Sequence, residues 1–421
     1  MQCGPVRIAW DVKFFPIGFS PCSLVRPFSS VRVSGTRSAQ EAGGSCPEND
    51  MTVQESCFRS IGRVEPVTRA KHIAGADAAC LSHTAERIAR LLRYDYGRAG
   101  NPATDTQQRV YFVPDHPLTA VEAGRLGVCS DSDLFGGVVP HAFVATRAAT
   151  HPPVSADAQV PQNWSYALAR IISGCVLRGF SAFSHADARL AAQRLLRTGP
   201  IRLDCGGSGA SHDILCNMDE FDEALNGIAV VDFATQGVVV EQALAEQTTY
   251  VVGRARVANE CVSYVGTRRA ARIESGRPIH SGCDLAVVAG DFSALDSVGL
   301  STEARHAVLA AARYDLAISH AYRSSFASRR SYDVVLGHDR HGSARMGVRG
   351  PSWSVAAESP AEVAAMAAFR DVPGLRCLRA STYEALGEVR DVPSDAMVYY
   401  RSGGADGETL TRYCTIDVHG C

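Results

Sequence analysis

Residues 198–216 read T-G-P-I-R-L-D-C-G-G-S-G-A-S-H-D-I-L-C, and residues 237–257 read G-V-V-V-E-Q-A-L-A-E-Q-T-T-Y-V-V-G-R-A-R-V. Apolar residues on both sides of the glycine-rich turn predict two neighbouring strands, because turn residues bound strands. Between the two stretches, Asn217 can cap a helix with Glu220 three residues later. The apolar run after Gly237 predicts another strand, which ends at Glu241–Gln242. The order is therefore strand, glycine turn, strand, helix, strand.

The chain before this stretch alternates between helical and strand patterns. Apolar residues at helical spacing predict a helix over residues 76–96, and Ser184 can cap another that runs to Arg197. Short apolar runs bounded by proline predict strands. These runs cover residues 109–113, 134–139 and 143–145, and residues 119–126 and 164–176 are expected to be helical.

The chain after this stretch predicts a second, larger layer of strands. Ser301 and Ser359–Pro360 are helix starts, because serine caps a helix and proline suits its first turn. The expected strands cover residues 249–258, 261–265, 284–289, 332–336 and 345–348, with a strand–turn–strand tail over residues 396–418. Strands and helices in this mixture predict an α/β (α+β) class.

Composition bounds the function. The 421 residues indicate two to three domains, and 46% hydrophobic residues supply an ample core. A net charge of −2 argues against a nucleic-acid binder, and no apolar run approaches the roughly 20 residues that span a bilayer. The 14 cysteines show no C-x-x-C pair, which argues against zinc and favours a cytoplasmic protein. Oligomeric state cannot be inferred.

The expected domains follow these patterns. Residues 1–60 are interpreted as a disordered or mis-called extension, with a start near Met51 as the leading explanation. Residues 61–160 are expected to form a small N-terminal α/β domain. Residues 161–240 are expected to form a subdomain around the glycine loop, and residues 241–421 the C-terminal subdomain.

The order of elements in residues 198–257 resembles the nucleotide-holding half of ATP-grasp proteins, in which two sheets close on an ATP. The resemblance implies that Gly206, Gly207, Ser208 and Gly209 hold phosphates through backbone N–H groups. It also implies that Glu241, Gln242 and Leu244 line the adenine pocket and that Glu246 faces a ribose hydroxyl. A tight hairpin turn and an ordinary strand end are the alternatives for the loop and for Glu241.

The resemblance places a Mg²⁺ site on a hairpin near the C-terminus, where carboxylate oxygens would bind the metal. Asp333 is the metal ligand expected there, and Gly350 stands where the second carboxylate would be. Arg202, Arg329 and Arg330 are the expected catalytic cations, which would neutralise phosphate charge in place of lysine. An ordinary surface ion pair is the alternative for Arg202.

Three further stretches resemble an uncharacterised bacterial family that is loosely labelled biotin-carboxylase-like. They are F-G-G-V-V-P-H-A-F-V-A-T-R from Phe135, S-R-R-S-Y-D-V from Ser328 and P-A-E-V-A-A-M-A-A-F-R from Pro360. The resemblance implies lysine at Arg147 and Asp204, asparagine at Ser331, and Glu-Gln at residues 350–351. This chain departs at all of these positions.

Three functions remain open from the sequence. The first is an ATP-dependent ligase that activates a small-molecule carboxylate as an acyl phosphate. The second is a catalytically degenerate descendant that binds nucleotide or acts as a scaffold. The third is an α/β protein that binds another anionic metabolite at the glycine loop. Cys205 as a reactive thiol and His338 with His341 as metal ligands are weaker hypotheses, against a buried thiol and a solvated turn.

Overall fold

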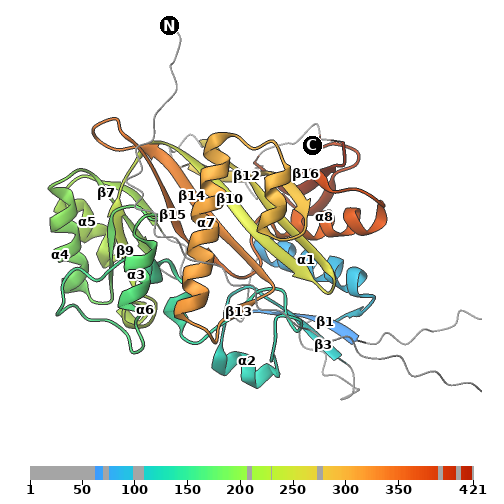
Figure 1. Ribbon diagram of the computed structural model, residues 1–421, viewed down its shortest axis with the longest axis horizontal. Coiled ribbons are helices and arrows are strands. Elements are labelled where there is room, and N and C mark those ends of the chain that lie inside the picture. Colours follow the sequence, from blue (N-terminus) through green and yellow to red (C-terminus); the bar gives the residue numbers. More distant parts are fainter. Residues whose placement is uncertain are drawn as a thin grey trace, which may run out of the picture. The chain divides into compact units, whose positions relative to one another are not determined.

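The computed structural model describes residues 62–69, 75–97, 109–205, 211–228, 230–272, 278–386, 392–403 and 409–419 (Figure 1). The chain divides into two compact units, Met1–Arg59 and Ser60–Cys421, and every described residue belongs to the second. The interpretation of residues 1–60 and the prediction for Gly206, Gly207, Ser208 and Gly209 therefore lie outside the described residues.

An eight-stranded antiparallel sheet dominates the second unit, in the order β15-β14-β10-β11-β12-β16-β18-β17. Consecutive residues of β10 point to opposite faces, as a strand requires. Val252 packs into the core under helix α7 (Thr302–Ala321), whereas Val251 packs into the core shared with α1 (Gly75–Leu92) and α8 (Ser359–Asp371). The strands are β10 (Ala245–Val257), β11 (Glu260–Arg272), β12 (Pro278–Ala289), β14 (Arg329–His338), β15 (Ala344–Ser352), β16 (Cys377–Leu386), β17 (Met397–Gly403) and β18 (Thr409–Asp417).

A smaller antiparallel sheet is formed by four strands from residues 179–242. Its order is β6-β9-β7-β8, with β6 (Gly179–Ala182), β7 (Ile201–Cys205), β8 (Ser211–Leu215) and β9 (Val238–Gln242). Helices α4 (His185–Leu196), α5 (Met218–Asn226) and α6 (Val230–Gln236) accompany it. Ser184 and Asn217 cap α4 and α5 as predicted, each side chain accepting from a backbone N–H three residues on.

The N-terminal part of the unit holds two three-stranded sheets. Parallel strands β2 (Asp95–Tyr96), β1 (Gly62–Val67) and β3 (Arg109–Pro114) form the first, and β13 (Phe326–Ala327), β5 (Gly137–Val139) and β4 (Leu118–Thr119) form the second. Helix α2 (Ala120–Leu126) begins with a complete capping box between Thr119 and Glu122. The predicted class, a small α/β part followed by two sheet layers with helices, is confirmed.

Two predicted elements are corrected. Residues 143–145 belong to a 3₁₀ helix, η1 (Ala142–Ala145), and not to a strand. The side chain of Phe143 packs against Trp164, Phe183 and Tyr322, so a short apolar run here reflects burial and not strand pairing. Helix α3 (Tyr166–Ile172) is shorter than the predicted residues 164–176. Among the described residues, no helix is both long and apolar enough to cross a membrane.

Candidate functional site

The small sheet turns one polar face away from its own core. Ile201 and Leu203 of β7 point into the core below α4 and α5, so Arg202 and Asp204 share the opposite face. Glu241 of β9 is the direct cross-strand partner of Arg202 and therefore lies on that face too. All three ionisable side chains are buried, at 1–3% exposure. Buried charged groups are uncommon unless they are paired.

Arginines neutralise the two carboxylates of this polar face. Nη1 of Arg202 lies 2.8 Å from Oδ2 of Asp204 and 3.2 Å from Oε1 of Glu241. Arg147, from the 3₁₀ helix η2 (Arg147–Thr150), donates a second hydrogen bond to Asp204. Nε of Arg349 on β15 lies 3.8 Å from Oε1 of Glu241. The face is thus tied to the edge of the large sheet by ion pairs.

One carboxylate oxygen of Glu241, Oε2, lacks a hydrogen-bond donor in the described part of the chain. Oε2 is buried and has no hydrogen-bond partner among the described residues. Its neighbour His151 has Nε2 at 3.7 Å, but that nitrogen donates to the carbonyl of Leu177 at 3.0 Å. Burial outweighs the attraction of Glu241 and lowers the pKa of His151, so the imidazole is neutral near pH 7. An unfilled buried acceptor costs free energy and suits a ligand that donates a hydrogen bond.

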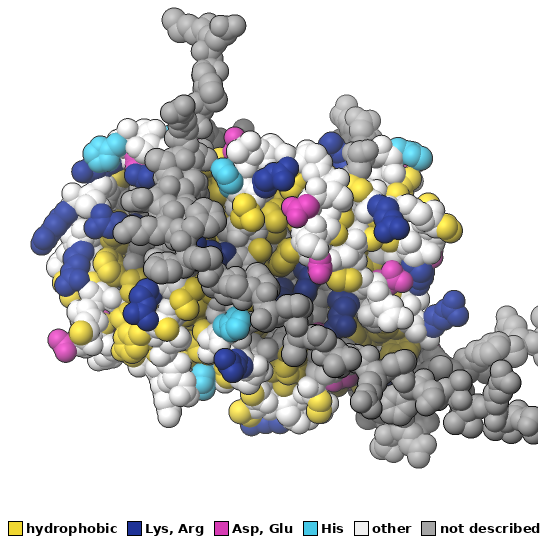
Figure 2. All heavy atoms as spheres, in the orientation of Figure 1, with side chains coloured by type: hydrophobic (Ala, Val, Ile, Leu, Met, Phe, Trp, Pro, Cys, Tyr) yellow, Lys and Arg dark blue, Asp and Glu magenta, His cyan; other side chains and the backbone are white. Residues whose placement is uncertain are grey.

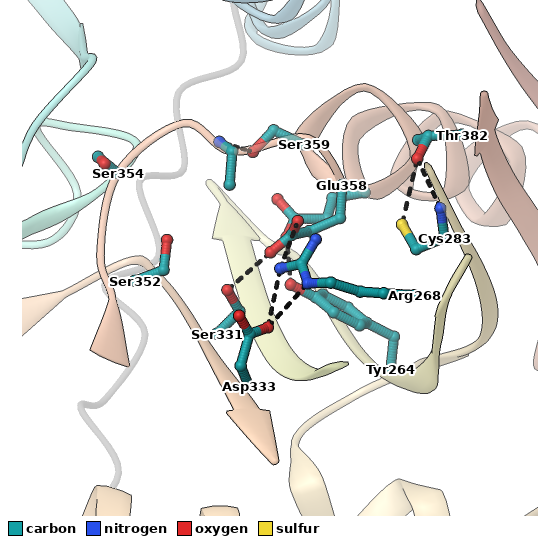
Figure 3. A network of polar contacts seen from close by, with 12 residues as sticks. Tyr264, Arg268, Cys283, Ser331, Asp333, Ser352, Ser354, Glu358, Ser359 and Thr382 are labelled. Atoms are coloured by element: carbon teal, nitrogen blue, oxygen red, sulfur yellow. Dashed lines mark hydrogen bonds and ion pairs between the residues drawn. The ribbon is translucent and has the colours of Figure 1, made fainter. Parts of the chain in front are cut away.

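A second cluster joins side chains from β14, from β11 on the other side of β10, and from the start of α8 (Figure 3). Nε of Arg268 donates to Oδ1 of Asp333 at 2.9 Å, and Nη2 of Arg268 lies 3.5 Å from Oε2 of Glu358. Ser331 donates to Glu358 at 2.7 Å. Burial alone would raise the pKa of Asp333, but Arg268 and then Arg147 outweigh it and hold the pKa below its usual value. Asp333 is therefore an ionised partner of arginine.

The three arginines predicted to be catalytic do not meet at one site. Arg202 belongs to the polar face of the small sheet. Arg329 is fully buried and donates to Glu358 and Glu362 below α8. Arg330, the next residue, points to the other side of β14 and lies 3.1 Å from Asp315 on α7. Neighbours in a strand face opposite ways, so Arg329 and Arg330 form ion pairs on opposite sides of the large sheet.

The hairpin expected to bind Mg²⁺ does not fit the metal. Gly350 pairs directly with Asp333, but its φ of +144° is unfavourable for other residues. A Cβ atom there would lie 2.7 Å from Cγ of Arg147. Arg147 thus occupies the place of the missing carboxylate. The described part of the chain also contains no cluster of three side chains that could bind a metal.

The remaining predicted site residues have varied surroundings. Leu244 is buried against Leu177 and Val335. The backbone N–H of Gln242 donates to the carbonyl of Arg178, which continues the sheet. Glu246 is 85% exposed beside His338, and His341 accepts a hydrogen bond from Arg340. Cys205 is buried.

Several residues of these clusters carried no sequence signal. Arg268, Arg349 and Glu358 lie in no motif, since their partners are distant in the chain. His151 follows Arg147 by four residues, a spacing too common to single out. The sequence marks Arg147, Asp204, Ser331 and Gly350 as departures from the family pattern.

Residues 65–414 match a family model described as "Protein of unknown function (DUF3182)". The chain belongs to this family. The sequence-based recognition of an uncharacterised family is thereby confirmed. A comparison with curated proteins finds no match.

Three solved structures illustrate the similarity in fold. Phosphoribosylamine–glycine ligase from Thermotoga maritima is 12% identical over 84% of this chain and 91% of that one, with a TM-score of 0.45. Carboxyaminoimidazole ribonucleotide synthase from Aspergillus clavatus, complexed with ATP, is 10% identical over 85% and 94%, with a TM-score of 0.45. A RimK domain ATP-grasp protein from Sphaerobacter thermophilus is 16% identical over 74% and 100%, with a TM-score of 0.36. At these scores the likeness carries no argument about function.

Proposed function

We propose that this chain is an ATP-grasp-like protein that binds an adenine nucleotide at the polar face of the small sheet and does not perform magnesium-dependent ligation. The observation that carries the proposal is the unfilled Oε2 of buried Glu241. The exocyclic amino group of adenine is a hydrogen-bond donor of the kind that this oxygen lacks. Leu244, buried near the end of the same strand, would supply apolar surface to the base.

The charges around Glu241 suit the phosphates of such a ligand. Arg147, Arg202 and Arg349 approach the face from three different elements, and a guanidinium can hold a phosphate through two parallel hydrogen bonds. Asp204 would repel phosphate, but Arg147 and Arg202 both neutralise it. The ligand would therefore meet an arginine-rich surface without needing a metal ion.

A ligase reaction has less support. ATP-dependent ligation would need Mg²⁺ at Asp333, and Arg268 already pairs with that carboxylate while Arg147 fills the space beside Gly350. The small-molecule carboxylate partner belongs to the ligase alternative alone. A cytoplasmic location remains part of the proposal.

Calorimetric titration with ATP tests this function. We expect binding of similar affinity with and without Mg²⁺, and a loss of at least about ten-fold in the Glu241→Gln variant, which replaces an acceptor oxygen by a donor. Glu246→Gln is the matched control, because Glu246 is exposed and off the polar face. Binding that requires Mg²⁺, with release of ADP in the presence of carboxylates, would favour the ligase. No binding in either condition would reject the nucleotide.

A further inference from the structure

A separate open cleft lies beside the end of the small sheet. Its volume is about 930 Å³, within the range of small-molecule sites. Its lining comes from helix α3, from residues 176–180 and from the turn between β14 and β15. Arg202, Asp204 and Arg147 are not among its lining residues, whereas His151 and Gln242 are, so this cleft adjoins the polar face described above.

The charge of this cleft is strongly positive. Arg170, Arg178 and Arg340 line it, and no carboxylate among the described residues lies within ion-pair distance of any of them. The single lining carboxylate, Asp339, is 3.0 Å from Nε of Arg345. Asp339 also accepts a hydrogen bond from the backbone N–H of His341, so its negative charge is balanced by partners within the hairpin. Nε of Arg340 donates to Nε2 of His341 at 2.9 Å, which leaves the two Nη groups of that guanidinium for a ligand.

Contacts with neighbouring backbone fix the positions of two of these arginines. The carbonyl of Arg178 accepts from Gln242 as β6 begins, so this residue is anchored at the end of the sheet. The aliphatic part of Arg340 rests on Gly199, where an added Cβ would lie 3.1 Å from Cδ of Arg340. Figure 2 shows dark blue arginine side chains gathered over the helices of the small sheet, with few magenta carboxylates among them.

Apolar and aromatic groups complete the lining. Leu177, Val176 and Met346 form apolar surface, and Tyr166 lies at the rim with 58% exposure. A fully hydrated ion such as a free metal would gain nothing from such a surface. A molecule with phosphate groups and a less polar body would use both parts of the lining.

We infer that this cleft binds a small phosphorylated molecule, with Arg170, Arg178 and Arg340 as its phosphate contacts. Planar guanidinium groups match phosphate oxygens bidentately, and cations that line a concave surface raise the local concentration of anions. The net charge of −2 for the whole chain makes this local excess of arginine more specific. This inference rests on arginines that the proposed nucleotide site does not use, although the cleft adjoins that site at His151 and Gln242.

The probe for this inference is inorganic pyrophosphate, titrated calorimetrically into the full chain at 0.05 M and 0.15 M salt. We expect Arg178→Ala and Arg340→Ala each to weaken binding at least ten-fold, because each removes a charge-assisted hydrogen bond. Binding should also weaken as salt rises. These side chains are exposed, so thermal melting of the variants should match that of the unmodified chain.

Two controls make the test decisive. Arg323 is an exposed arginine outside the cleft, and Arg323→Ala should leave pyrophosphate affinity within two-fold. Arg202→Ala should do the same, because Arg202 belongs to the polar face of the small sheet. No binding of pyrophosphate, or equal losses in Arg323→Ala and Arg178→Ala, would overturn the inference. A loss confined to Arg202→Ala would also overturn it and would move the anion to the proposed nucleotide site.

Discussion

The buried guanidinium of Arg329 offers a direct test of what stabilises this fold. Its side chain has no exposed surface and donates to Glu358 at 2.8 Å and to Glu362 at 3.0 Å. It also donates to the carbonyls of Ser352 and Ser354 at 3.1 and 2.6 Å. The substitution Arg329→Met keeps most of the volume and removes every one of these hydrogen bonds.

The expected loss of unfolding free energy depends on which carboxylate loses its charged partner. Glu358 keeps Arg268 as a partner, whereas Glu362 keeps, among the described residues, only the hydroxyl of Tyr264. Removing one partner of a buried ion pair typically costs about 3–5 kcal/mol. We therefore expect the free energy of unfolding to fall by about that amount at pH 7.5, which is a large share of the 5–15 kcal/mol typical of folded proteins.

The pH dependence separates this mechanism from a simple loss of packing. Burial raises the pKa of Glu358, but Arg268 and then Arg329 outweigh burial and hold the pKa below its usual value. A carboxylate with a lowered pKa contributes stability above its unfolded-state pKa, and that contribution is lost as the pH falls through the folded-state pKa. Without Arg329 the buried carboxylates favour their protonated forms. The destabilisation should therefore be smaller at pH 4.5 than at pH 7.5, by about 1 kcal/mol or more.

Urea unfolding of both chains at the two pH values, followed by circular dichroism, measures these quantities. Arg323→Met, at an exposed position, is the matched control and should change the free energy of unfolding by less than about 0.5 kcal/mol. A loss below 1 kcal/mol for Arg329→Met, or a loss that is equal at the two pH values, would refute the reasoning.

Three other substitutions probe the rest of the structure. Gly350→Glu should lower the free energy of unfolding by about 1–3 kcal/mol, because φ is +144° and Arg147 fills the space, and adding Arg147→Ala should recover part of the loss in urea unfolding. Burial lowers the pKa of His151, so its contribution to stability is complete above about pH 6.5 and falls as the pH drops below that value. His151→Gln should flatten the decline in stability between pH 7 and pH 5, and an unchanged decline would count against this assignment. Asn217→Ala should cost about 1 kcal/mol in thermal unfolding, since the side chain accepts from the backbone N–H of Glu220 at 2.9 Å.

Local signals predicted most of the elements of this chain. The caps at Ser184, Asn217 and Ser301 mark real helix starts, because a cap needs only a side chain and the backbone three residues on. The alternation of Val251 and Val252 between two cores follows from the period of a strand. The apolar run at residues 143–145 led to a wrong strand prediction, because a buried 3₁₀ helix and a buried strand can show the same short run of apolar residues.

The contents of the candidate site depended on residues far apart in the chain. Asp204 meets Arg147 across 57 positions, Arg268 meets Asp333 across 65, and Arg329 meets Glu362 across 33. No pattern in neighbouring residues encodes such pairs, because charged side chains choose partners by distance in space. The sequence could therefore mark Asp204 and Gly350 as unusual positions. Only the packing of the two sheets decides that arginines occupy the space around them.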